Sequence, residues 1–274
     1  MRFYISADIE GIAGVVSRDN LMPGGFEYEA ARDWMTQAVV SACETARELG
    51  AEEIVVSDSH GTGQNIRYER MPPYVQLVRC WPRMLGMMQG IEIGKYDGAF
   101  LIGYHASGSS LHGTLAHTIS GHLFQELRLN GNILSEASLS GAIAGHFGVP
   151  ILLVAGDDVV VNEARAQLGD IATACLKYSN GWMSARNLSP QQADSALRTG
   201  VKEAINSAGR IAPHVVETPN VLDIRLRNRL TAEWLVYLDC VEQLDAYTIR
   251  YRTTDITKVS SFLTFLTSAR KALE

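Results

Sequence analysis

Apolar residues in the first half of the chain come in short runs that predict β-strands separated by loops and helices. The runs cover residues 3–7, 53–57, 74–78, 98–103 and 150–155. Between the first two runs, residues 26–49 carry apolar side chains at helical spacing and stop at Gly50. This alternation predicts an α/β fold, in which helices flank a mostly parallel sheet.

The middle of the chain continues the alternation with less regular stretches. Helices are predicted at residues 84–89, 137–147 and 159–168 and after the Ser189-Pro190 start signal, and a further strand at 172–176. Asn130-Gly131 is typical of a hairpin turn between two strand-like runs. Residues 178–188 have no clear pattern, so we interpret them as a loop.

The pattern changes at residues 211–219, where two prolines bracket a histidine. Beyond this segment, strands are predicted at 221–226 and 246–252, and helices at 231–238 and 255–273. We therefore expect an α/β domain of residues 1–212 and a smaller α+β C-terminal domain of residues 213–274. From its position, that second domain is expected to contribute to assembly or to cover the functional site.

Composition narrows the class of protein. The 274 residues are 46% hydrophobic and 20% charged, which is ordinary for a globular chain with a large core. No apolar run approaches the ~20 residues of a membrane span, and the amino end lacks a signal-peptide pattern. The net charge is −6, and no basic stripe suggests a nucleic-acid partner. We expect a cytoplasmic protein with neither membrane nor nucleic acid as a partner.

The four cysteines carry no metal-binding or redox signal. They lie far apart and form no C-x-x-C pair; they are Cys43, Cys80, Cys175 and Cys240. Their apolar or helical surroundings predict buried free thiols.

The polar residues that end the predicted strands are candidates for chemistry. Asp8 and Glu10 follow the first strand at a spacing that places both side chains on one side of an extended chain. His60 and His105 follow two other strands. The carboxyl ends of parallel strands meet at one sheet edge, where open α/β sheets bind ligands. Carboxylates mixed with imidazoles suit Zn²⁺, Mn²⁺ or Fe²⁺, and the number of groups favours a two-metal site with a bridging carboxylate.

Other motifs give weaker signals. The glycines of residues 11–14 form neither a P-loop nor a dinucleotide fingerprint, and Ser138 and Ser140 lack the G-x-S-x-G elbow of serine hydrolases. A phosphate-ester hydrolase also favours two metals, but it needs basic clamps, and Arg18 and Arg67 are the nearby candidates. Asp157 and Asp158 are expected to cap the helix that follows them, and the same position at the carboxyl edge of the sheet would also let them line the site.

Several separated motifs occur in the same order as in a known family. They are Ser6-Ala7-Asp8-Ile9-Glu10-Gly11, Asp58-Ser59-His60, Gly103-Tyr104-His105-Ala106, Ala116-His117-Thr118, the Glu136 region and Ala155-Gly156-Asp157-Asp158. In these motifs the chain resembles the D-aminopeptidase family, peptidase family M55. The resemblance implies a di-zinc aminopeptidase that releases D-amino acids such as D-alanine from short peptides by a metal-bound hydroxide. It also implies a ring-shaped homodecamer whose active sites face an inner chamber.

The resemblance assigns roles to individual residues. Asp8 would bridge the two Zn²⁺ ions of each subunit, Glu10, His60, His105 and Glu136 would complete their coordination, and His117 would be the catalytic residue. Glu136 and His117 enter through the resemblance alone. For His117 the family suggests a nucleophile, whereas chemistry equally favours general acid–base catalysis or oxyanion stabilisation.

Two further functions stay open at this point. The same scaffold suits a metallohydrolase of L-peptides or amides, which activity on matched D- and L-alanyl peptides would distinguish. The second alternative is of a different class, a metal-binding protein without catalytic activity. The complete set of candidate ligands argues against that second reading, because a decayed site would be expected to lack some of them.

Overall fold

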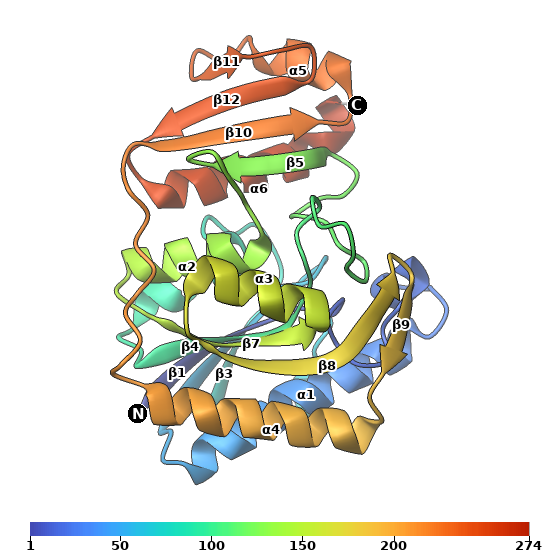
Figure 1. The fold of residues 1–274 in the computed structure, drawn as a ribbon, viewed down its shortest axis with the longest axis vertical. Coiled ribbons are helices and arrows are strands. Elements are labelled where there is room, and N and C mark those ends of the chain that lie inside the picture. The colour runs from blue at the N-terminus through green and yellow to red at the C-terminus, as the bar shows by residue number, and fades with distance from the viewer. Residues whose placement is uncertain (274) are drawn as a thin grey trace.

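The computed structural model describes the backbone of residues 1–273 and the side chains as far as residue 269. It contains two β-sheets that are separated by helices, with further helices on the outer face of the larger sheet (Figure 1). The strands of the larger sheet are β1 (Arg2–Ala7), β2 (Glu53–Asp58), β3 (Val75–Val78), β4 (Gly98–Tyr104), β7 (Ile151–Asp157), β8 (Ala172–Gly181) and β9 (Ser184–Asn187). They lie in the order β3-β2-β1-β4-β7-β8-β9, and all are parallel except β9, which runs antiparallel to β8.

Helices cover both faces of the larger sheet. One face packs against α1 (Tyr28–Glu48) and α4 (Pro190–Ser207), and the other against α2 (Glu136–His146) and α3 (Asp158–Leu168). Alternating residues of β1 reach the two sides, since Phe3 and Ile5 belong to the α1 and α4 side whereas Tyr4 belongs to the α2 side. Burial of both faces explains why these strands read as short, nearly continuous apolar runs.

The smaller sheet is antiparallel. Its strands are β5 (Phe124–Leu129), β6 (Asn132–Ile133), β10 (Asn220–Leu226), β11 (Val241–Gln243) and β12 (Thr248–Thr253), in the order β11-β12-β10-β5-β6. The helices α5 (Arg229–Leu235) and α6 (Ile256–Leu273) accompany it, and α6 lies between this sheet and α2 (Figure 1). These two sheets and their helices confirm the predicted fold class.

The smaller sheet draws on two distant parts of the chain. β10 pairs with β5, so that Ile224 lies opposite Leu127. The turn between β5 and β6 has Asn130 and Gly131 at φ values of 51° and 81°, which confirms the predicted hairpin. β5 and β6 precede the expected domain boundary at residue 213, and that boundary stays a prediction.

Three local predictions were wrong. Residues 84–89 form no α-helix, because Gly86 and Gly90 have positive φ values and leave only the 3-10 turns η3 (Gly86–Met88) and η4 (Ile91–Ile93). Residues 178–188 contain the end of β8 and the paired strand β9. All four thiols are free, but Cys80 and Cys240 are exposed because they lie in connecting segments.

Two more 3-10 turns complete the described elements, namely η1 (Arg18–Leu21) and η2 (Tyr68–Arg70). Among residues 1–273, no helix combines the length and the apolar character that crossing a membrane requires.

Candidate metal centre and active site

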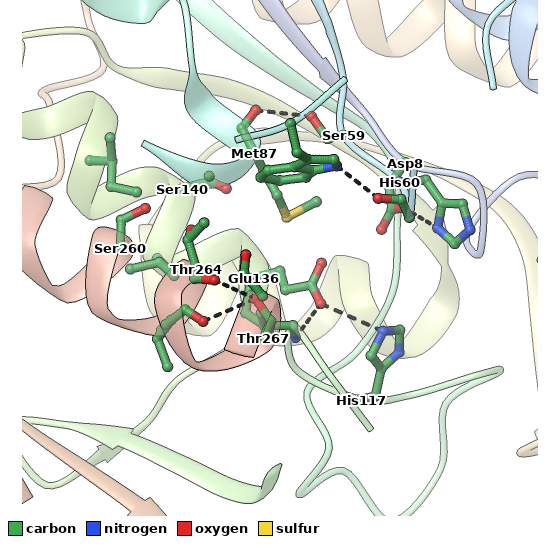
Figure 2. Close-up of a pocket in the computed structure, with 18 of the residues that line it drawn as sticks. Asp8, Ser59, His60, Met87, His117, Glu136, Ser140, Ser260, Thr264 and Thr267 are labelled. Atoms are coloured by element: carbon green, nitrogen blue, oxygen red, sulfur yellow. Dashed lines mark hydrogen bonds and ion pairs between the residues drawn. The ribbon is translucent and has the colours of Figure 1, made fainter. Parts of the chain in front are cut away.

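The predicted site residues gather at one cavity of about 440 Å³. Its wall includes five of the six, namely Asp8, Glu10, His60, His117 and Glu136. The sixth, His105, is 1% exposed and contacts Asp8 and Glu136 from below the cavity surface. Figure 2 shows Glu136 and His117 directed toward one another, with the α6 side chains Ser260, Thr264 and Thr267 on another side of the cavity.

Asp8 and Glu10 converge through a turn that crosses the end of β4. The residues after Ala7 have left the extended conformation, and their backbone bonds to β4: the Asp8 amide donates to Ile102 O at 2.8 Å, and Gly11 to Gly103 O at 2.7 Å. A Cβ atom on Gly103 would lie 2.1 Å from Asp8 O, and Gly103 has a φ of +74°. Glycine is therefore required where the two backbones meet. The predicted convergence is confirmed, although its cause is this crossing and not an extended chain.

A buried lysine fixes the same turn from below. Lys177 of β8 is 0% exposed, and its Nζ donates to the carbonyl oxygens of Glu10, Ile12 at 3.1 Å and Val15 at 2.6 Å. Burial lowers the pKa of Lys177 to about 8. Lys177 is not predicted from the sequence, because its place in a strand gives no sign of which loop it meets.

The loop that carries His60 is held by Asp58. The Asp58 carboxylate accepts from the Asn65 and Ile66 amides at 2.6 and 2.7 Å, and the Asn65 side chain bridges Asp58 and the His60 carbonyl. His60 Nε2 lies 3.0 Å from Leu21 O, which can only accept, so Nε2 carries the proton. Nδ1 therefore faces the carboxylates.

His60 Nδ1 contacts both carboxylates of the turn after β1. It lies 3.2 Å from Asp8 Oδ1 and 2.9 Å from Glu10 Oε2. This contact joins the loop after β2 to the turn after β1, as predicted for groups at neighbouring strand ends.

His105 and Glu136 form the opposite side of the cluster. His105 Nδ1 donates to Ala106 O at 3.0 Å, which leaves Nε2 directed at Asp8 Oδ2 and Glu136 Oε1, at 3.5 and 3.4 Å. Glu136 is the first residue of α2, and its Oε1 accepts from the Ile119 amide at 2.6 Å. The helix start therefore places this carboxylate beside the end of β4.

His117 lies in the segment between β4 and β5. Its Nδ1 donates to Leu115 O at 2.9 Å, so that Nε2 faces the cluster, 3.9 Å from Glu10 Oε1 and 3.8 Å from Glu136 Oε1. Burial, and then the charge of His105, hold the pKa of His117 below its usual value. Its neutral form can accept a proton at Nε2.

The remaining titratable groups are strongly coupled. Burial and then the Glu10 charge raise the pKa of Asp8 to about 8. Burial alone would lower the pKa of His60 and His105, but Glu10 for His60 and Glu136 for His105 outweigh it and hold both pKa values well above the usual range. The metal-free cluster therefore retains protons that a bound cation would displace.

The cluster fits a transition-metal ion. Three overlapping groups bring one ligand atom of each member within 4.8 Å of the others: Asp8, Glu10 and His60; Asp8, His105 and Glu136; Glu10, His105 and His117. Among the described residues, the buried atom His105 Nε2 has no hydrogen-bond partner, and its carboxylate neighbours lie 3.4 and 3.5 Å away. Once its proton is displaced, this nitrogen offers a lone pair beside carboxylate oxygens, which is the ligand chemistry of zinc.

Other predicted residues lie elsewhere. Arg67 pairs with Asp33 at 3.0 Å and with Glu29 at 2.9 Å, away from the cavity. Asp157 caps α3, as expected, through bonds from the Val159 and Val160 amides. The sequence also did not predict that α6 lines the cavity, which it does through residues such as Ser260, Thr264 and Thr267. Helical spacing alone does not tell which element a helix will face.

Comparisons with known proteins agree on one family. A model of the peptidase M55 family, described as D-aminopeptidase, matches residues 1–265. The D-aminopeptidase of Bacillus subtilis (strain 168) is 28% identical over 257 residues, which are 93% of each protein. A solved structure of the Zn-dependent D-aminopeptidase DppA from Bacillus subtilis, a self-compartmentalizing protease, has a TM-score of 0.92 at 26% identity, covering 98% of this chain and 97% of that one.

Proposed function

Because the chain belongs to the peptidase M55 family of D-aminopeptidases, we propose that it is a zinc-dependent aminopeptidase acting on short peptides whose first residue is a D-amino acid, such as D-alanine. The observation that carries this proposal is the convergence of six acid and imidazole side chains at a single cavity. The zinc dependence of the related Bacillus structure supports it.

The geometry favours two zinc ions per subunit. One set of ligands would be Asp8, Glu10 and His60, and the other Asp8, His105 and Glu136. Asp8 belongs to both sets, and its two carboxylate oxygens face different histidines, so Asp8 is the residue suited to bridge them. When bound, zinc supplies a Lewis acid that polarises a carbonyl and lowers the pKa of water.

His117 would be the catalytic proton carrier. Its Nδ1 is engaged by Leu115 O, and its Nε2 is the one atom free to exchange a proton with substrate. The lowered pKa keeps Nε2 unprotonated near neutral pH, so it can take a proton during attack and give it to the leaving amine. The family's nucleophile role is the competing assignment for this residue.

The cavity would bind the substrate's free amine, beside a zinc ion or beside one of the carboxylates that hold it. Its lining includes Asp8, Glu10 and Glu136, but no lysine or arginine among the described residues. The first side chain would then lie against the wall formed by Leu139, Ile143 and α6. Chirality would be selected by the shape of this wall.

We also propose that the chain assembles into a ring-like homo-oligomer, with the decamer as the expected size. The support is the description of the related structure as self-compartmentalizing. Light scattering coupled to size exclusion tests this directly, and a monomer at assay concentrations would contradict it.

Metal content and hydrolysis, measured on one preparation, test the proposed function. We expect close to two zinc ions per chain and release of D-alanine from D-alanyl-D-alanine, lost on chelation and restored by zinc. L-alanyl-L-alanine is the matched substrate, and equal or faster release of L-alanine would favour the L-specific alternative. Metal binding with no hydrolysis of either peptide would favour a metal-binding protein without catalysis.

A further inference from the structure

A second cavity shares His117 with the first. It also has a volume of about 440 Å³, and its lining includes Arg18, His122, Trp182 and Arg227. His117 therefore borders both hollows, the one that holds the candidate metal ligands and the second one.

The two cavities carry opposite charge. Of the described residues, those lining the first include three carboxylates and neither lysine nor arginine, whereas those lining the second include two arginines and neither aspartate nor glutamate. Neither Arg18 nor Arg227 has a carboxylate within 4.0 Å among the described residues, in contrast with Arg225 and Arg250 nearby. Two guanidinium groups without a counter-ion in one hollow attract an anion.

Both arginines are held by contacts that leave donors free. The Arg18 guanidinium lies 4.6 Å from the Trp182 ring centroid, a cation–π contact that uses its face and not its N–H groups. Arg227 uses Nε alone, to donate to Gly121 O at 2.6 Å. Its two terminal nitrogens remain available for a bidentate carboxylate.

Trp182 ties this cavity to the segment that carries His117. Its Nε1 donates to Ala116 O at 3.1 Å, and its carbonyl accepts from the Leu115 amide at 2.7 Å. Trp182 lies between β8 and β9, the hairpin that Figure 1 shows beside the segment following β1. The second cavity is thus built from three distant parts of the chain around the proposed catalytic histidine.

We propose that Arg18 and Arg227 form a subsite for the C-terminal carboxylate of the substrate. This inference rests on the proposed function. At neutral pH a dipeptide carries a cationic amine and an anionic carboxylate on opposite sides of its one amide bond. With the scissile amide beside His117, the amine would lie in the cavity of the zinc site and the carboxylate would face Arg18 and Arg227. The enzyme should therefore prefer dipeptides with a free carboxylate to the same peptides with a C-terminal amide.

The experiment compares D-alanyl-D-alanine with D-alanyl-D-alanine amide, in zinc-loaded wild type, Arg18→Gln, Arg227→Gln and the double variant. KM is measured from steady-state turnover. The affinity for the dipeptide and for its amide is measured by calorimetry in variants that also carry His117→Ala, so that the peptides are not hydrolysed during the titration. Arg186→Gln is the control for Arg18, because Arg186 also lies over an aromatic ring, that of Tyr178. Arg225→Gln is the control for Arg227, because Arg225 lies two residues away, is exposed as Arg227 is, and does not line the cavity.

We expect each cavity variant to raise KM for the free dipeptide about tenfold or more with kcat nearly unchanged, and to leave the amide unaffected. Both controls should resemble wild type. Equal affinity for dipeptide and amide when both arginines are present, or equal losses for both compounds in the arginine variants, would overturn the subsite. A carboxylate preference in binding without any turnover would support the subsite and count only against the proposed function.

Discussion

The imidazole rings of His105 and His117 are stacked, with centroids 4.1 Å apart and 10° between their planes. Two imidazolium rings at this distance would repel, so the cluster favours one charge on the pair. The opposite pKa shifts of the two residues agree, since that of His105 is raised and that of His117 is lowered. The Nε2 atoms of both histidines face two carboxylates, but that of His105 lies nearer to them, at 3.4 and 3.5 Å against 3.8 and 3.9 Å. The charge of the pair therefore belongs on His105, and His117 remains available for proton transfer.

Replacing His117 should separate catalysis from metal binding. In His117→Ala we expect kcat to fall by about 10²- to 10⁴-fold, because the proton acceptor at Nε2 is lost, while two zinc ions remain bound. The measurements are steady-state kinetics and metal analysis. His112→Ala, at an exposed histidine outside both cavities, is the control and should retain activity. Loss of one zinc in His117→Ala would instead make His117 a ligand, as its place beside Glu10 and His105 allows.

Zinc affinity should rise with pH. In the metal-free protein the pKa values of His60 and His105 are raised, so both imidazoles hold protons at neutral pH, and Asp8 has a pKa of about 8. Zinc binds the deprotonated forms, so each displaced proton strengthens apparent binding about tenfold per pH unit.

Competition with a chromophoric chelator between about pH 6 and about pH 8 measures this dependence. The affinity of the chelator itself must be corrected for pH in the same buffers. An apparent zinc affinity that is constant over this range would show that the ligands are already deprotonated before the metal binds.

Removing the buried ammonium of Lys177 should weaken both the fold and the metal site. Lys177→Met leaves the buried carbonyl oxygens of Glu10 and Val15 without their donor, while Ile12 O keeps the Val15 amide, and we expect the free energy of unfolding to fall by about 2 kcal/mol. Zinc affinity should fall about ten- to a hundredfold, because the turn that carries Glu10 loses its support. Urea unfolding and zinc titration measure the two effects.

Lys202→Met, at an exposed lysine of α4, is the control for Lys177 and should change neither quantity. A Lys177→Met variant with wild-type zinc affinity would limit the lysine to a role in stability.

Asp58 should stabilise the His60 loop without binding metal. Asp58→Ala removes three hydrogen bonds to a buried carboxylate, and we expect a loss of about 3 kcal/mol in unfolding free energy. Asp170→Ala, at an exposed aspartate, should be neutral in the same thermal or urea unfolding assay. If Asp58→Ala unfolds like wild type, the loop must be held by its other contacts.

The site residues differ in how far the sequence predicts them. Asp8, His60 and His105 follow apolar strands, and the common edge of a parallel sheet is enough to bring them together. Glu136 and His117 follow irregular segments, where periodicity carries no signal, and only the family resemblance pointed to them. Lys177 and the α6 side chains contact parts of the chain that are distant in the sequence, namely the turn after β1 and the cavity. These contacts depend on packing that no local sequence pattern encodes.

The pairing of β10 with β5 also governs how the chain can be divided. The two strands are neighbours in one sheet, and Leu127 lies opposite Ile224. In the sequence, however, three strands of the larger sheet, β7, β8 and β9, come between them. A fragment that begins at residue 213 would keep β10, β11 and β12 but expose the β10 edge that β5 covers in the whole chain. Open edges recruit strands from other molecules, so such a fragment is expected to aggregate unless residues 124–133 are supplied with it.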